Sequence, residues 1–272
     1  MSFQIKNKVV MVTGGARGIG LAIVKKLLKE NVKGLSVVDI NENIGQNAVE
    51  MLKQEFGPKV IFIKTDISDY KSFENAFKVS LEHYKNIDIL FNNAGIHNDM
   101  EYSKEIDVNV KGTMNGVILG IEKYLKHHRS GEEGVIVNTS SIAGLEATLL
   151  PTYSATKFAV NGITINWGTK LHYDDSKVRV FGICPGYTDT EINTNVELKK
   201  FRPSLRKAWA DYSPYFDMFK QSAEFVAEEA IKLLSQAPNG SLWVIEHTSP
   251  AYQVIWPRKN NDDNDKKFIS NL

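Results

Sequence analysis

Seven short runs of apolar, mostly β-branched residues recur along the chain. Within each run the apolar residues follow one another without polar alternation, which is typical of strands buried on both faces of a sheet. The longer segments between the runs repeat apolar residues every three or four positions, as on one face of an amphipathic helix. The runs occupy residues 9–12, 35–38, 60–63, 87–91, 135–137, 178–183 and 242–245.

Strands and helices are therefore expected to alternate along almost the whole chain. This order predicts the α/β class and a single-domain Rossmann fold, in which a doubly wound, seven-stranded parallel sheet carries helices on both faces. The chain shows no internal repeat and no linker, so residues 1–258 are expected to form one domain. Residues 259–272 are rich in Asn, Asp and Lys and are expected to form a disordered tail.

Residues 191–222 interrupt this alternation between the sixth predicted strand and the last predicted helix. A long insertion at this place is expected to act as a lid over a substrate. Its aromatic side chains could line a pocket or could only pack the insertion against itself. They are Trp209, Tyr212, Tyr215, Phe216 and Phe219.

Charge and composition exclude several classes of protein. The 33 basic and 32 acidic residues leave a net charge of +1, which gives no electrostatic reason to expect nucleic acid or an anionic membrane as partner. No apolar run approaches the roughly 18 residues of a spanning helix, and no signal peptide is evident. The single cysteine, Cys184, fits a reducing compartment, so a cytoplasmic location is expected. No cluster of ligands accompanies His127 and His128, so no metal site is expected.

A glycine-rich loop follows the first predicted strand and leads into a helix. Gly14, Gly18 and Gly20 allow the backbone to approach a ligand closely. The helix N-terminus behind them offers free N–H groups and a partial positive charge to a diphosphate. In this strand–loop–helix context, the loop predicts a dinucleotide site.

Asp39 and Arg17 indicate different dinucleotides. Asp39 ends the second predicted strand, where a carboxylate can accept the ribose hydroxyls of NAD and repel the 2′-phosphate of NADP. Arg17 lies within the glycine loop and could instead pair with that phosphate. We favour NAD, because repulsion between like charges costs more than an exposed arginine gains.

Tyr153 and Lys157 open the helix after the fifth predicted strand. Four residues make about one helical turn, so the two side chains share a face. A free tyrosine has a pKa of about 10, and a neighbouring ammonium favours the phenolate, so the pair is a candidate proton acceptor. Such a pair taken alone is common on helix surfaces, so its interpretation depends on other segments.

Polar residues in two other segments support the catalytic interpretation. Ser140 and Ser141 follow the fifth predicted strand, where a hydroxyl can donate to a substrate oxygen. Asn109 lies in an otherwise apolar helix, and a poor helix former at that place indicates binding of water or backbone.

Together these residues resemble the short-chain dehydrogenase/reductase family, in the family's order and over residues 8 to about 245. The matching motifs are Thr13-Gly14…Gly18-Ile19-Gly20, Asn92-Asn93-Ala94-Gly95, Tyr153…Lys157 preceded by Asn109 and Ser141, and Pro185-Gly186…Thr190. The resemblance implies a Rossmann fold and an oxidoreductase that forms a homodimer or homotetramer.

The resemblance also implies catalytic roles at the matching positions. Tyr153 would be the acid/base, and Lys157 would bind the nicotinamide ribose and lower the tyrosine pKa. Ser141, which fits the family's Ser-x-x-Gly pattern where Ser140 does not, would orient the substrate oxygen. Asn109 would hold a water of the proton relay.

Cofactor contacts follow from the same resemblance. Asp66 would contact the adenine and Asn93 the neighbouring ribose, while Thr188 and Thr190 would hold the carboxamide. The full expected set is Gly14, Arg17, Gly18, Ile19, Gly20, Asp39, Ile40, Asp66, Ile67, Asn93, Tyr153, Lys157, Gly186, Thr188 and Thr190.

Within the family, residues 183–190 and the short stretch 95–109 are most similar to NAD-dependent 15-hydroxyprostaglandin dehydrogenases and insect-type alcohol dehydrogenases. The former carry glutamines shortly before the catalytic tyrosine, where this chain has Ala147-Thr148-Leu149-Leu150-Pro151. A more apolar wall suits a less functionalised alcohol or a hydroxylated lipid.

The leading hypothesis is therefore an NAD-dependent dehydrogenase of a small-molecule secondary alcohol or hydroxylated lipid. An NADP-dependent carbonyl reductase, motivated by Arg17, is one alternative. A non-catalytic nucleotide-binding protein is another, since a fold alone does not establish activity.

Overall fold

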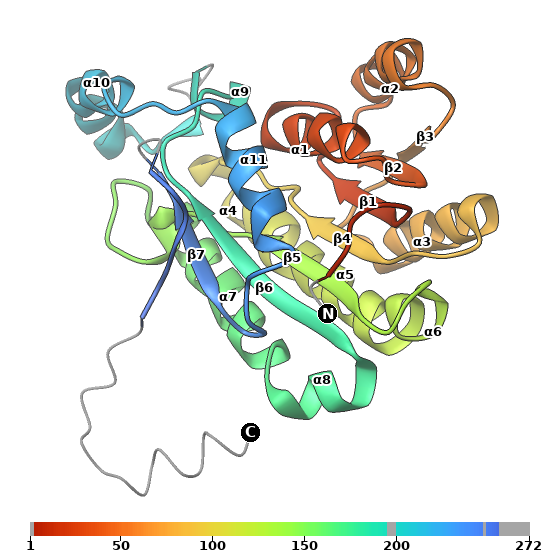
Figure 1. Ribbon diagram of the computed structural model, residues 1–272. Coiled ribbons are helices and arrows are strands. Elements are labelled where there is room, and N and C mark those ends of the chain that lie inside the picture. Colours follow the sequence, from red (N-terminus) through yellow and green to blue (C-terminus); the bar gives the residue numbers. More distant parts are fainter. Residues whose placement is uncertain (1–2, 195–199, 247–248, 256–272) are drawn as a thin grey trace, which may run out of the picture.

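The computed structural model describes residues 3–194, 200–246 and 249–255. One sheet runs through this part of the chain, with its strands in the order β3-β2-β1-β4-β5-β6-β7-β8 (Figure 1). The first seven strands are parallel, as the apolar runs predict. Their bounds are β1 Val9–Thr13, β2 Gly34–Asp39, β3 Val60–Lys64, β4 Ile89–Asn92, β5 Gly134–Thr139, β6 Val178–Pro185 and β7 Leu242–Ile245.

An eighth strand, β8 (Tyr252–Gln253), lies antiparallel to β7 at the edge of the sheet and was not predicted. Both of its residues are exposed, and two residues are too few to show an alternating or continuous apolar pattern.

Helices cover both faces of the sheet, and each face has its own apolar core. Neighbouring residues of a strand point to opposite faces, so Val10 and Val12 join one core while Met11 joins the other. The first core packs under α1 (Gly18–Lys29), α2 (Glu42–Phe56) and α11 (Ala223–Leu233). The second packs under α3 (Tyr70–Tyr84), α5 (Thr113–Ile118), α6 (Leu125–His128) and α7 (Pro151–Trp167).

The strand order reverses at β1, which pairs with β2 on one side and with β4 on the other. In sheets of this kind, ligands bind beyond the carboxyl ends of the strands at such a switch point. The glycine loop after β1 and the Asn-Asn-Ala-Gly segment after β4 both lie there.

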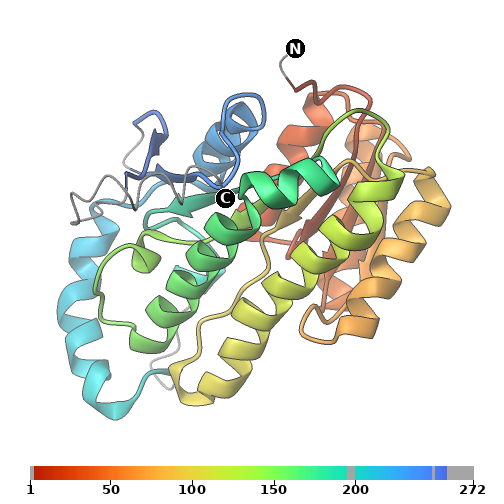
Figure 2. The same cartoon turned by 90° about the horizontal axis from the view of Figure 1, so that it is seen from below.

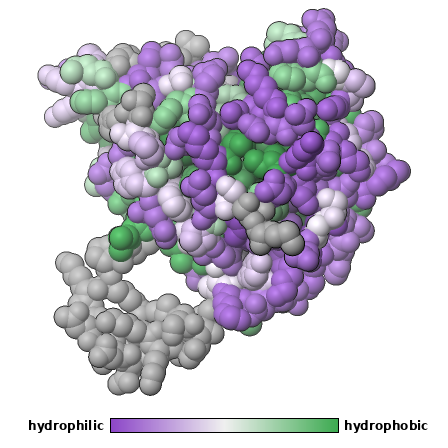
Figure 3. All heavy atoms as spheres, in the orientation of Figure 1, coloured by the Kyte–Doolittle hydropathy of each residue, from purple (hydrophilic) through white to green (hydrophobic). Residues whose placement is uncertain are grey.

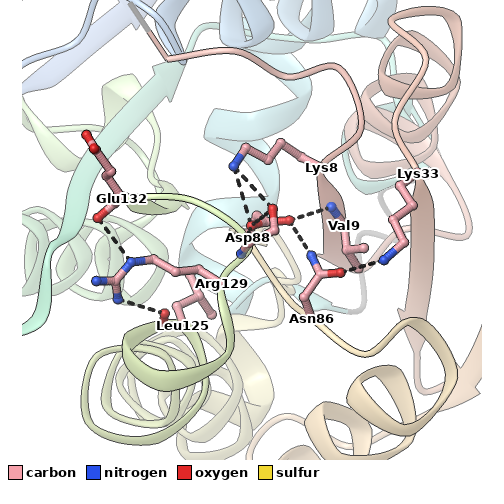
Figure 4. A network of polar contacts seen from close by, with 9 residues as sticks. Lys8, Val9, Lys33, Asn86, Asp88, Leu125, Arg129 and Glu132 are labelled. Carbon is pink, nitrogen blue, oxygen red and sulfur yellow. Dashed lines mark hydrogen bonds and ion pairs between the residues drawn. The ribbon is translucent and has the colours of Figure 1, made fainter. Parts of the chain in front are cut away.

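At the opposite, amino-terminal edge of the sheet, Asp88 lies at the centre of a network of polar contacts (Figure 4). This fully buried carboxylate accepts hydrogen bonds from the Val9 amide at 2.8 Å and from Asn86 Nδ2 at 2.6 Å. It also accepts from the amide and hydroxyl of Ser130 at 2.6 and 2.7 Å, and Lys8 lies 3.6 Å away. The Asp88 carboxylate thus links the starts of β1 and β4 to the segment after α6. These hydrogen bonds stabilise the fold and lie at the edge of the sheet opposite the expected ligand site.

The insertion at residues 191–222 contains α9 (Glu191–Thr194) and α10 (Pro203–Asp217), and α10 stands away from the sheet beyond the carboxyl end of β6 (Figures 1 and 2). Trp209 is buried and packs on Phe201 with ring centroids 4.8 Å apart, so it packs the insertion. Tyr212, Tyr215 and Phe219 are exposed. The Phe216 side chain and the predicted tail at 259–272 lie outside the described residues.

Hydrophilic side chains cover most of the face seen in Figure 3. Among the helices of the described ranges, none combines the length and the apolar character needed to cross a bilayer.

Candidate active site

The glycine loop between β1 and α1 has a backbone that other residues would not adopt without strain. Gly14 and Gly18 have φ angles of +60° and +54°. A Cβ at Gly14 would lie 2.9 Å from the Cα of Ala94, and one at Gly20 would lie 2.1 Å from the Gly14 oxygen. The chain therefore turns tightly onto the N-terminus of α1, where unpaired N–H groups can receive a diphosphate, as predicted.

Asp39 ends β2 beside this loop and is held in place by backbone amides. Its carboxylate accepts hydrogen bonds from the Asn41 amide at 3.0 Å and from the Ala16 amide of the loop at 3.4 Å. This places a carboxylate next to the glycine loop, where a cofactor ribose would be received.

Arg17, also expected to contact the cofactor, forms an ion pair with Glu191. Its Nη1 lies 2.7 Å from Oε2 of Glu191, the first residue of α9, and both side chains are more than half exposed. No local pattern indicates this pair, because 174 positions separate the two residues. The carboxylate of Glu191 balances the charge that motivated the NADP alternative.

Asn93 joins the ends of three strands. Its Nδ2 donates to the Thr13 carbonyl at 3.0 Å, and its Oδ1 accepts from the Thr139 hydroxyl at 3.3 Å. Asp66 accepts from the amide and hydroxyl of Ser68 at 2.9 and 2.6 Å. Both residues thus lie at the expected edge of the sheet, with part of their hydrogen-bonding capacity used by the protein.

The segment after β6 reaches back to the glycine loop. A Cβ at Gly18 would lie 3.3 Å from the Thr190 methyl carbon, and a surface depression beside them is also lined by Glu191. Thr188 is buried and donates to the Gly186 carbonyl at 2.8 Å. The three remaining isoleucines of the predicted set differ in exposure. Ile67 is buried in the second core, Ile19 is partly buried against the first core, and Ile40, just after β2, is 60% exposed.

Tyr153 and Lys157 lie in the first turns of α7, which has Pro151 at its start. The Lys157 ammonium lies 5.4 Å from the centre of the Tyr153 ring and donates to the Thr139 carbonyl at 2.9 Å. Burial lowers the pKa of Lys157 to about 8 and raises the pKa of Tyr153 to about 12. The pair therefore lies where the sequence places it, at the carboxyl end of β5 and away from bulk water.

The structure distinguishes the two serines after β5. Ser141 forms a hydrogen bond with Tyr153 that opposes the rise in the tyrosine pKa, and its Oγ also accepts from the Ala143 amide at 3.1 Å. Ser140 is buried and donates to the Lys157 carbonyl at 3.1 Å, so it holds the backbone of α7. This geometry supports the choice of Ser141 as the residue facing a substrate oxygen.

Asn109 lies in η2 (Asp107–Gly112), a π-helical turn, and its side chain is fully engaged by the protein. Its Oδ1 accepts from the Ile96 amide at 2.8 Å, and its Nδ2 donates to the Ile96 carbonyl at 2.9 Å and to Thr156 Oγ1 at 3.1 Å. The side chain thus clamps the segment after β4 against α7. Its role in a proton relay stays a prediction.

Three buried titratable residues beside Tyr153 were missed by the sequence reasoning: His97, Asp99 and Glu105. Burial lowers the pKa of His97 to about 4 and raises the pKa of Glu105 to about 7. A signal for Glu105 was present in the sequence, since it precedes Asn109 by four residues and so shares its helical face. No local pattern identifies the other two.

Among the described residues, no group of three or more His, Cys, Asp or Glu side chains is arranged to hold a metal ion.

Comparisons with known proteins identify the family of this chain. The family model for short chain dehydrogenase matches residues 8–200. The 15-hydroxyprostaglandin dehydrogenase (NAD+) of Bos taurus is 32% identical, with 89% of this chain and 92% of that protein aligned. The development-specific 25 kDa protein of Sarcophaga peregrina is 29% identical over 88% of this chain and 92% of its own length.

Among solved structures, a short chain dehydrogenase/reductase of Burkholderia phymatum in complex with NAD has the same fold, with a TM-score of 0.78, 24% identity and 91% of each chain covered. The family model spans most of the sequence, and the relatives align over nearly their whole length. The chain therefore belongs to the short chain dehydrogenase family.

Proposed function

We propose that this protein is an NAD-dependent dehydrogenase that oxidises a secondary alcohol or a hydroxylated lipid. The observation that carries the proposal is the meeting of Tyr153, Lys157 and Ser141 at the carboxyl end of β5. The NAD-dependent hydroxyprostaglandin dehydrogenases among its relatives, at 32–34% identity, support the same reaction on a CH–OH group.

The residues around the glycine loop fit NAD. Gly14 and Gly20 allow the chain to turn tightly onto the N-terminus of α1, which would receive the diphosphate, and Asp39 presents a carboxylate beside this loop. A 2′-phosphate would meet that carboxylate, while Arg17 is already paired with Glu191. These contacts favour NAD over NADP and weaken the carbonyl reductase alternative.

Tyr153 accepts the proton of the substrate hydroxyl, and the surrounding residues make this possible. Bound NAD supplies a hydride acceptor and a positive charge. In the protein alone the Tyr153 pKa is about 12, so the phenolate at pH 7 requires roughly 7 kcal/mol of stabilisation, from about 1.4 kcal/mol for each pKa unit. Lys157 is cationic below its pKa of about 8 and supplies part of this through its charge. Ser141 donates to the substrate oxygen as it becomes a carbonyl.

A substrate screen with the Tyr153→Phe variant tests the proposal. The purified protein is incubated with NAD and a panel of secondary alcohols and hydroxylated lipids, and NADH formation is followed. Loss of the phenolic oxygen should lower kcat by about a thousandfold or more, because no other group accepts the proton. The control is Tyr173→Phe, which removes a hydroxyl bound to Glu133 at the far end of β5.

Two results would contradict the proposal. One is full activity of Tyr153→Phe. The other is tight NAD binding without turnover of any alcohol, which would support a non-catalytic nucleotide-binding protein instead.

A further inference from the structure

Buried polar side-chain atoms without a hydrogen-bond partner are concentrated in one short segment. Six such atoms occur in the described part of the chain, and four of them belong to His97, Asp99 and Glu105. Leaving such an atom unpaired costs free energy, so natural proteins retain few of them, and those retained call for an explanation. Among the described residues, these unpaired atoms gather most densely in the cluster formed by His97, Asp99 and Glu105.

The cluster lies between the catalytic tyrosine and the insertion. His97 is 9% exposed, and its ring meets the Tyr153 ring edge-on with centroids 5.6 Å apart. On its other side it meets the Phe201 ring of the insertion at 5.0 Å. Arg202 places its Nε 3.3 Å from Asp99 Oδ2, although neither oxygen of Asp99 accepts a well-aligned hydrogen bond.

Glu105 completes the cluster from α4 (Tyr102–Ile106), which packs against α7. Its side chain is fully buried. One carboxyl oxygen accepts from the Asn98 amide at 2.9 Å, and the other has no partner. The Glu105 charge raises the pKa of Tyr153, and the charges of Asp99 and Lys157 act on the pKa of Glu105, so these groups lie close enough to interact.

We propose that His97, Asp99 and Glu105 form a polar subsite that receives a second hydroxyl group of the substrate, distinct from the hydroxyl that is oxidised. The inference rests on the proposed dehydrogenase function and narrows its substrate class to diols and other polyhydroxylated compounds. The more apolar wall at residues 147–151 would then face the hydrocarbon part of such a substrate.

The charges and donors of the subsite favour a hydroxyl over ionic groups. A substrate carboxylate would meet Asp99 and be repelled. A substrate ammonium is not required, because Arg202 already pairs with Asp99 and the Glu105 pKa of about 7 keeps much of that carboxyl neutral at pH 7. A hydroxyl donates and accepts at once, so it can donate to Asp99 and accept from the imidazole or from protonated Glu105.

Matched substrates and two variants test the subsite. The value of kcat/KM is compared for a simple secondary alcohol and for diols of the same carbon skeleton, with the second hydroxyl at successive carbons. The wild-type protein should prefer one diol by at least about tenfold, since a buried group built to bind a hydroxyl rejects the analogue without it. In His97→Phe, which keeps a ring beside Tyr153 and Phe201, and in Glu105→Leu, which removes both carboxyl oxygens, this ratio should fall toward one.

The readout is the ratio of kcat/KM for the diol to kcat/KM for the simple alcohol. A general loss of activity in a variant lowers both values and therefore does not imitate the result. Glu82→Gln, an exposed glutamate of α3, is the control and should keep the wild-type ratio. NAD binding and thermal unfolding of each variant report its fold.

Two outcomes would overturn the subsite. If the wild-type protein oxidises simple alcohols and diols equally, or if both variants keep its preference, the buried atoms bind ordered water only and the dehydrogenase function stands. If no alcohol of either kind is oxidised, the dehydrogenase function fails and the subsite fails with it.

Discussion

Burial controls the ionisation of the residues around Tyr153. It raises the pKa of the tyrosine and of Glu105, and it lowers the pKa of Lys157 and of His97. In every case the neutral form is favoured, because a low-dielectric environment penalises charge. In the unliganded protein Tyr153 is therefore protonated at pH 7, and we expect the reactive phenolate to form when the positive charge of the cofactor is added.

His97 and Glu105 should affect stability in opposite directions between pH 4 and 7. The His97 pKa falls from 6.5 to about 4, so its contribution is present above pH 6.5 and is lost as the pH falls toward 4. The Glu105 pKa rises from 4.5 to about 7, so its contribution is present below pH 4.5 and is lost as the pH rises toward 7. Each amounts to at most about 3 kcal/mol, so the two largely cancel in the wild-type protein.

Replacing either His97 or Glu105 should make the pH dependence that the other residue contributes to stability measurable. Relative to the wild-type protein, Glu105→Gln should lose unfolding free energy as the pH falls from 6.5 to 4, and His97→Phe should lose it as the pH rises from 4.5 to 7. Denaturant titrations at a series of pH values measure both slopes. Parallel curves for the two variants would show that the residues do not titrate as described.

Asp39 is proposed to determine the preference between the two dinucleotides. Asp39→Ala removes the carboxylate that meets a 2′-phosphate, so the affinity for NADP should rise by about tenfold or more relative to that for NAD, roughly the 1.4 kcal/mol of a modest charge repulsion. Titrations with both cofactors measure the ratio. Glu42→Ala, an exposed carboxylate at the start of α2, is the control. An unchanged ratio in Asp39→Ala would place the discrimination elsewhere.

At the scale of elements, the helical stretch from Tyr102 to His128 lies unusually close to the sheet. Glycines at every fourth position, Gly112, Gly116 and Gly120, face it. A Cβ on any of them would come within 2.3–2.7 Å of a side chain that belongs to or follows a strand. The π-helical turn η2 at the start of this stretch carries Asn109, which clamps the segment after β4 to α7. Close packing and an irregular turn together help to hold the segment that carries His97 and the helix that carries Lys157 beside Tyr153.

The insertion is proposed to act as a lid whose docking depends on Phe201. This side chain is fully buried between His97 and Trp209, so Phe201→Ala should cost about 3 to 5 kcal/mol of docking free energy. We expect faster limited proteolysis within residues 200–217 and a raised KM for the alcohol, with NAD affinity unchanged. Tyr215→Ala, which changes an exposed aromatic of α10 in the same insertion, is the control. An unchanged KM would show that the insertion does not cover the substrate.

At the scale of the whole molecule, we propose that the exposed face of α7 forms the interface of the expected homodimer or homotetramer. Phe158 is 41% exposed on this helix, one residue after the catalytic lysine. If α7 packs against its twin, Phe158→Asp should bury a charge in the interface and yield monomers in analytical ultracentrifugation. Met51→Asp, on exposed α2, should leave the assembly unchanged. A Phe158→Asp variant that keeps its assembly state would exclude this interface.

The sequence by itself determined the features that depend on neighbouring residues. Continuous apolar runs predicted all seven parallel strands, because a strand buried on both faces has no polar alternation. The four-residue spacing of Tyr153 and Lys157 and the three glycines after β1 were equally local signals, and the structure places both at one edge of the sheet. The two-residue strand β8 was too short to carry such a signal.

Only the tertiary structure decided which distant residues meet. Glu191 reaches Arg17 across 174 positions, and Phe201 packs on His97 across about a hundred, so no periodicity could reveal either contact. The family's Ser-x-x-Gly pattern already favoured Ser141 over Ser140, whereas only the structure shows that the side chain of Asn109 forms hydrogen bonds with Ile96 and Thr156. Local pattern fixes where strands and helices form, whereas the unpaired atoms of His97, Asp99 and Glu105 arise from how those elements pack.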